Sequence, residues 1–158
     1  MKTLIIYASR HGCARRAAEK IGEAFGDGVE ICDVRQSAQF KLDQFERVII
    51  GVSIHIGKIQ SRIRNYIEKN LAQLLEKQVG LFICHMAEAA EAEQEFTNAY
   101  PQQLIEHAAA IGLFGGEFNF EKMNFVEKYM IKKVGKVTES VSRINEDNIA
   151  DFIAKMRK

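Results

Sequence analysis

The sequence predicts an α/β fold: a five-stranded parallel sheet in the doubly wound order 2-1-3-4-5, covered by helices on both faces in three layers. The main observation is that short β-rich apolar runs alternate with amphipathic helical patterns along the chain. The 158 residues suffice for one domain with a real core, and no repeat, low-complexity tract or linker divides them. We therefore predict a single domain over residues 1–158.

Five apolar runs predict the strands: Thr3–Ala8, Val29–Val34, Arg47–Ile54, Val79–Cys84 and Ala110–Phe118. Helical spacing follows most of them, first from Ala14 to Phe25, then from Ile63 to Leu75. Glu91–Ala110 is also helical in pattern, and Pro101 either splits it or occupies a first helical position. Asn145 is expected to cap a last helix, whereas Ser37–Phe45 has no period and is predicted to be a connection.

Composition excludes several classes of protein. The net charge of +1 gives no global field that favours nucleic acid. No apolar run approaches the roughly 20 residues of a membrane span, and Lys2 followed by a core strand does not indicate a signal peptide. The three widely spaced cysteines predict neither a disulfide framework nor a zinc site, and we expect no metal. Reduced thiols in a cytoplasmic protein are the simplest interpretation.

The loop Ser9–Ala14 leaves a buried strand and enters a helix, which is where an anion can bind. Gly12 allows close backbone approach, Ser9 adds a hydroxyl, and three arginines add positive charge nearby: Arg10, Arg15 and Arg16. A phosphate is the natural ligand, and the alternative is a tight turn without a ligand. The GxGxxG and GxxxxGK[ST] motifs are absent, so neither a dinucleotide fingerprint nor a Walker loop is predicted.

Four segments resemble one family. Residues 4–21, LIIYASRHGCARRAAEKI, resemble the flavodoxin phosphate loop T/S-x-T-G-x-T. Residues 47–70, RVIIGVSIHIGKIQSRIRNYIEKN, look closer to the flavodoxin-domain branch that includes menaquinone-dependent protoporphyrinogen oxidase. FGGEFNFEKMNFVEKYMIKKVGK resembles that branch's fifth strand and basic insert, and INEDNIADFIAKM its closing helix. The resemblance implies a flavodoxin-like fold with one non-covalently bound FMN.

The resemblance also implies the residues of the FMN site. Six residues fall on the phosphate loop: Ser9, Arg10, His11, Gly12, Cys13 and Ala14. Five fall on the loop beside the flavin ring: Ser53, Ile54, His55, Ile56 and Gly57. After Cys84, the loop on the other side of the ring begins with His85, Met86 and Ala87. No catalytic residue is assigned.

Two positions depart from the family pattern. His11 and Ala14 stand where the phosphate loop has threonine, so two hydroxyl donors are missing. We expect weakened rather than abolished FMN binding, since backbone N–H donors survive any substitution. Cys13 is either a reactive thiol at a helix N-terminus or a small side chain where only the backbone matters.

A helical insert is expected at about 119–143, with an apolar side and a lysine-rich remainder. It either contacts a membrane surface or hydrophobic substrate, or packs on its own domain. Three functions stay open: an oxidoreductase that passes electrons from an organic substrate to a quinone, an electron carrier without its own substrate, and a flavin-free binding protein. The expected location is the cytoplasm, with membrane association through the insert as an option; a redox partner protein is the alternative to a quinone.

Overall fold

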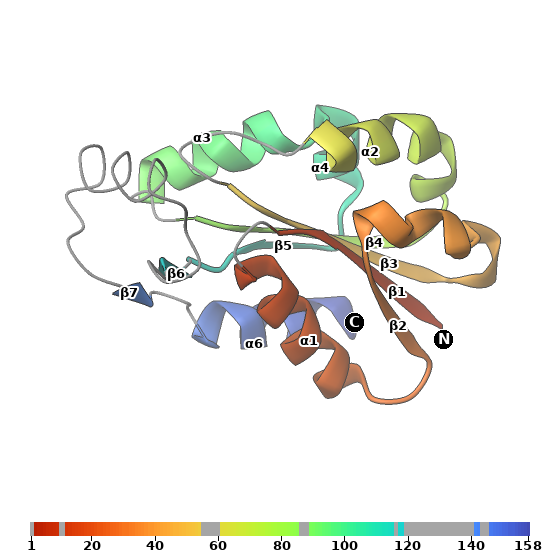
Figure 1. Ribbon diagram of the computed structural model, residues 1–158, viewed down its shortest axis with the longest axis horizontal. Helices are drawn as coiled ribbons and strands as arrows, with labels where there is room; N and C mark the ends of the chain where they lie inside the picture. The colour runs from red at the N-terminus through yellow and green to blue at the C-terminus, as the bar shows by residue number, and fades with distance from the viewer. Residues whose placement is uncertain are drawn as a thin grey trace.

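A five-stranded parallel sheet in the order β2-β1-β3-β4-β5 forms the centre of the computed structural model (Figure 1). The structure describes residues 2–9, 12–54, 61–85, 89–115, 117–118, 141–142 and 146–158. The strands are β1 (Thr3–Ala8), β2 (Val29–Asp33), β3 (Arg47–Ser53), β4 (Gln78–Cys84) and β5 (Ala110–Leu113). This order confirms the predicted doubly wound fold class.

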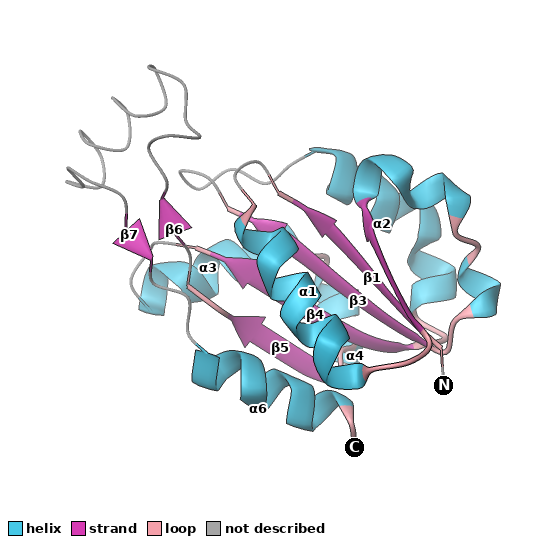
Figure 2. Ribbon diagram, turned by 60° about the horizontal axis from the view of Figure 1, so that its bottom comes forward, coloured by secondary structure: helices cyan, strands magenta, loops and turns pink. Residues whose placement is uncertain are grey.

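Helices cover both faces of the sheet (Figures 1 and 2). On one face lie α1 (Cys13–Phe25) and α6 (Glu146–Met156), and on the other lie α2 (Ser61–Leu74), α3 (Ala89–Ala99) and α4 (Gln102–His107). Two 3-10 helices, η1 (Val34–Gln39) and η2 (Leu42–Gln44), connect β2 to β3. Each face therefore has its own buried core, and alternate residues of every central strand contribute to one or the other.

The fifth strand is shorter than predicted. It ends at Leu113, and Phe114 turns its ring fully into the core next to Gly115, whose φ is 71°. Residues Glu117–Phe118 form β6, which pairs antiparallel with β7 (Val141–Ser142) in a separate ribbon. The expectation of one strand over Ala110–Phe118 is wrong, because the positive φ of Gly115 takes the chain out of the sheet.

The predicted helix over Glu91–Ala110 is two helices, α3 and α4. Pro101 precedes α4 with φ −64° and ψ 143°, so the chain is extended there, and Pro lacks the N–H that a continuous helix needs. The second and third strands end one residue earlier than predicted, and the connection Ser37–Phe45 contains 3-10 turns.

The expected insert at about 119–143 and the capping residue Asn145 lie almost wholly outside the described residues. Only Val141 and Ser142 are described there, and they form a strand instead of a helix. A contact of this segment with a membrane stays a prediction.

On the α1 side of the sheet, the register of the parallel strands decides which core residues lie side by side. Phe82 of β4 is paired with Gly51 of β3 and with Gly112 of β5. A Cβ on Gly51 would lie 1.9 Å from Cζ of Phe82, and a Cβ on Gly112 would lie 2.3 Å from the ring of Phe114. The two rings stack at a centroid distance of 4.8 Å. Glycine is therefore required where aromatic rings lie across neighbouring strands.

We expect Gly51→Ala to lower the free energy of unfolding by roughly 3 kcal/mol, because the new methyl group overlaps the buried Phe82 ring. Gly26→Ala is the control for backbone strain without overlap: its φ is 76° and its ψ −128°, and nothing lies within 4 Å of an added Cβ, so a smaller loss of about 1–2 kcal/mol is expected. Urea unfolding followed by circular dichroism measures both. Equal losses in the two variants would contradict the packing argument.

Candidate functional site

Three residues form a row across the sheet at the carboxyl ends of the strands. Ala8 pairs with Val52, so Ser9 and Ser53 are the next residues in register, and Ser53 pairs with Cys84. Strand alternation turns this row toward α1, as it does the buried Ile49 and Phe82. The hydroxyl oxygens of Ser9 and Ser53 are 3.4 Å apart.

The N-terminus of α1 lies next to this row, where Gly12 is beside Ser9, Ala14 is beside Ser53 and Cys13 is beside Cys84. The N–H of Gly12 donates to Oγ of Ser9 at 2.9 Å, and the N–H of Ala14 donates to Oγ of Ser53 at 3.2 Å. The thiol of Cys13 lies next to that of Cys84 at the end of β4, and the interaction of the two thiols shifts the pKa of each. Serine hydroxyls from two strands thus accept from N–H groups that a helix start leaves without intrahelical partners.

Gly12 makes this arrangement possible. Its φ of 88° is in the left-handed region, and a Cβ there would lie 3.2 Å from Nη1 of Arg16. The first turn of α1 contains no acidic residue, so nothing on the helix opposes its positive end. Arg15 donates to Glu19 at 3.0 Å on the exposed surface of the helix. The positive end of α1 therefore lies beside the serine row with no acidic side chain in its first turn.

The thiol pair is polarised. Interaction with the Cys84 thiol lowers the pKa of Cys13, and the positive charge of Arg16 acts in the same direction, while burial opposes both. The same interaction, together with burial, raises the pKa of Cys84 well above its ordinary value. The exposed fractions are only 5% for Cys13 and 3% for Cys84, so bulky reagents do not reach either sulfur in the native fold.

His85 joins the site to the end of β5. Its N–H donates to the carbonyl of Gly115 at 2.7 Å, and the N–H of Gly115 donates to Nε2 of His85 at 3.3 Å. Because Nε2 accepts, a neutral ring carries its proton on Nδ1. The N–H of Ile54 donates to the carbonyl of Cys84 at 2.9 Å, so the loops after β3 and β4 begin side by side.

The structure brings seven of the predicted site residues together at the carboxyl edge of the sheet: Ser9, Gly12, Cys13, Ala14, Ser53, Ile54 and His85. Ile54 packs its side chain on the α2 face, away from the serine row. The other seven lie outside the described residues: Arg10, His11, His55, Ile56, Gly57, Met86 and Ala87.

Sequence reasoning missed two features of the site. Ala14 lacks a hydroxyl, but the hydroxyl of Ser53, from another strand, stands beside its N–H. Cys84 is a buried core residue next to Cys13, and the sequence gives no sign of this contact between the two thiols. The three strands end at the same level of the sheet, and alignment of their predicted ends is the signal that could have predicted this row.

Within the described part of the chain, no group of three or more His, Cys, Asp or Glu side chains is arranged to hold a metal ion. No helix in the same part of the chain is long and apolar enough to cross a membrane.

Comparison with known proteins identifies the family to which this fold belongs. The flavodoxin domain family matches residues 4–145, so the chain belongs to the flavodoxin domain family. Among curated proteins it is similar to protoporphyrinogen IX dehydrogenase [quinone] of Leishmania major, with 21% identity over 146 residues that cover 87% of this chain and 63% of that protein. The protein of the same name from Escherichia coli K12 is also 21% identical, and 81% of its length is covered.

Two solved structures share the fold. Oxidised flavodoxin 2 from Bacillus cereus matches with a TM-score of 0.59 and 18% identity, covering 99% of this chain and 98% of that one. A flavodoxin of Fusobacterium nucleatum bound to flavin mononucleotide matches with a TM-score of 0.53 and 16% identity, again covering 99% and 98%. The chain spans less than two thirds of the Leishmania relative, so the activity of that whole protein is not transferred by the match.

We expect the thiols of the three cysteines to titrate at different pH values. Cys13 loses its proton at the lowest pH because its pKa is lowered by Cys84, whereas burial raises the pKa of Cys32 to about 12. Cys84→Ala removes the neighbouring thiol and should move the titration midpoint of Cys13 to higher pH. The ¹³Cβ chemical shift of each cysteine, followed against pH, measures every midpoint without a reagent that must reach a buried sulfur. A lower midpoint for Cys32 or Cys84 than for Cys13 would contradict the expected order.

Proposed function

We propose that this protein binds FMN at the Ser9–Ser53–Cys84 row and acts as a redox protein. The observation that supports this proposal is that the N-terminus of α1 lies next to two serine hydroxyls at the carboxyl ends of β1 and β3. In this strand order the chain passes from β1 to neighbours on opposite sides, and ligands of doubly wound sheets bind at that switch point.

The residues of the row suit a phosphate group. Each serine hydroxyl accepts from one N–H and keeps its own proton, which it can donate to a phosphate oxygen. Arg16, next to Gly12, and the positive end of a 13-residue helix add favourable charge. The methyl group of Ala14 is fully buried in the core, so the donor at this position is the backbone with Ser53 behind it.

A bound flavin would supply a ring that takes up one or two electrons, which none of the standard side chains offers. The chain's part is to hold the phosphate at Ser9–Ala14 and to orient the ring between the loops that follow Ser53 and Cys84. These two loops start together because Ile54 is hydrogen-bonded to Cys84. His85 is fixed by Gly115, which gives that side of the site a defined hydrogen-bonding edge.

For the reaction, we propose an oxidoreductase that passes electrons from an organic substrate to a quinone or a similar acceptor. The support is the printed name of two relatives, protoporphyrinogen IX dehydrogenase [quinone], at 21% identity. One observation favours a second candidate, a flavin-free binding protein: the N–H groups of Gly12 and Ala14 already have acceptors within the protein.

Titration of the purified protein with FMN, followed by absorbance, separates these candidates. Saturable binding with perturbed flavin bands supports the flavoprotein, and absence of binding at high micromolar FMN supports the flavin-free alternative. With FMN bound, quinone-dependent turnover of an organic substrate supports the oxidoreductase. A stable one-electron reduced form without turnover would instead support an electron carrier.

We expect Ser53→Ala to weaken FMN binding by roughly tenfold, since the hydroxyl positions the N–H of Ala14 and can donate to phosphate. Ser37→Ala is a matched control, because Ser37 is a half-buried serine whose hydroxyl donates to the carbonyl of Val34 on the other face of the sheet. Fluorescence quenching of FMN measures both affinities. An equal effect of the two substitutions would argue against the site.

A further inference from the structure

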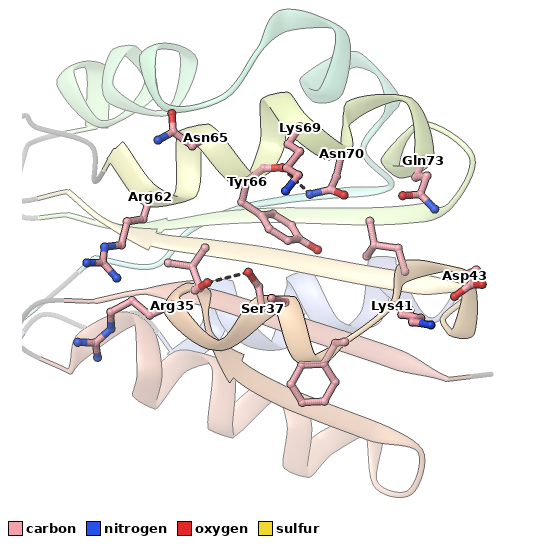
Figure 3. A pocket seen from close by; sticks show the side chains of 14 residues that line it. Arg35, Ser37, Lys41, Asp43, Arg62, Asn65, Tyr66, Lys69, Asn70 and Gln73 are labelled. Carbon is pink, nitrogen blue, oxygen red and sulfur yellow. Dashed lines mark hydrogen bonds between the residues drawn. The ribbon is translucent and has the colours of Figure 1, made fainter.

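A cavity of about 740 Å³ lies between the η1–η2 connection and α2 (Figure 3). Its walls come from Val34–Asp43 on one side and from α2 residues between Arg62 and Gln73 on the other. Val34, Leu42 and the adjoining α2 residues Ile63 and Ile67 belong to the core on the α2 face. The cavity is therefore on the opposite side of the sheet from α1 and the serine row.

The lining of the cavity is strongly basic. One carboxylate, that of Asp43, lines the cavity. The four cationic side chains of the lining are Arg35, Lys41, Arg62 and Lys69. Arg35 is held by Asp33, with Nη2 2.8 Å from Oδ2 and Nε 3.0 Å from Oδ1. Among the described residues, no carboxylate lies within ion-pair distance of the other three. Asp33 interacts with Arg62 as well as with Arg35, so the four cations face two carboxylates, Asp33 and Asp43, and the cavity keeps an excess of positive charge.

Tyr66 adds a donor inside this basic cavity. Its side chain projects from α2 toward η1, as Figure 3 shows. The hydroxyl is buried and has no hydrogen-bond partner among the described residues. Burial raises the pKa of this hydroxyl, so it remains protonated and able to donate. Buried hydroxyls are nearly always paired, so this one indicates an acceptor that the described residues do not supply.

Apolar groups complete the lining. Phe40 is half-buried, Leu42 and Val34 are buried, and all three border the cavity. The amide side chains of Asn65 and Gln73 add neutral donors and acceptors. The volume is within the range of small-molecule sites, and the lining combines this apolar patch with a majority of polar and charged side chains.

We propose that this cavity binds an amphipathic organic anion, whose anionic oxygens meet the cationic side chains of the lining and the hydroxyl of Tyr66 and whose apolar body lies against Phe40 and Leu42. Carboxylates, sulfonates and phosphates share the required chemistry, since each offers anionic oxygens that accept hydrogen bonds. This site is separate from the proposed flavin site and does not depend on it.

The test uses 8-anilinonaphthalene-1-sulfonate as the probe and N-phenyl-1-naphthylamine as its uncharged counterpart. Chemical-shift mapping on the ¹⁵N-labelled full chain locates each bound molecule, and equilibrium dialysis measures affinity. We expect saturable binding of the sulfonate that weakens with added salt, with shifts at η1, η2 and α2. The uncharged molecule should bind far more weakly. Octanoate and octyl phosphate, as competitors, then distinguish a carboxylate from a phosphate ligand.

Three variants give the expected pattern. Arg62→Gln should raise the dissociation constant of the sulfonate roughly threefold, because the guanidinium is exposed and its charge is partly screened. Tyr66→Phe should raise it roughly fivefold through loss of the buried donor. Arg64→Gln is the matched control, an exposed arginine on the same helix that does not line the cavity, and should leave the affinity unchanged.

Several outcomes would overturn the proposal: equal affinity for the charged and uncharged probes, shifts confined to Ser9–Ala14, failure of both competitors, or equal effects of Arg62→Gln and Arg64→Gln. The amide spectra of the variants report whether each is folded, so a loss of binding is not confused with a loss of structure. FMN affinity, measured on the same samples, is expected to be unaffected. A failure here therefore leaves the flavin proposal untouched, and the reverse also holds.

Discussion

Parallel pairing of β1, β3 and β4 in a fixed register is the constraint on which the rest of the structure depends. It aligns Gly51 with Phe82 in the core and, two residues later, Ser53 with Cys84 at the edge of the sheet. A slip of one residue would turn every side chain of a strand to the opposite face. The serines would then point away from α1, and the Phe82 ring would lose the space above Gly51.

A cluster of aromatic rings, formed by Phe82, Phe114 and Phe152, links the position of the strands to that of the helices. The ring of Phe152 in α6 meets Phe82 and Phe114 edge-on, with centroid distances of 6.1 and 5.4 Å. Beside these rings, α1 turns small residues to the sheet, namely Ala14, Ala17 and Ala18, so its axis lies close to the strands. Close approach of this helix brings its first N–H groups within hydrogen-bond distance of strand hydroxyls. The geometry of the site therefore depends on how closely α1 packs against the sheet.

The fold class could be predicted from the sequence because alternation of apolar runs and helical spacing is a local property. The loop Ser9–Ala14 and the residues after β3 and β4 could likewise be placed at one edge. The bond between Ser53 and Ala14 could not, since it depends on a tertiary register across 39 positions. The end of β5 was missed because Phe114 continues the apolar pattern while leaving the sheet. The cavity beside Tyr66 was missed because one wall is a segment without any period.

Self-capping of α1 has a consequence for how such a chain can change over evolutionary time. The helix start is completed by Ser9 and Ser53, so its integrity does not require a guest molecule. Loop residues around Gly12 can then be replaced without a simultaneous repair elsewhere, since the acceptors come from strands. The stability of the helix start and the binding of a ligand are therefore separate properties of this fold. This end of the sheet is therefore held by contacts within the protein whether or not a ligand is bound.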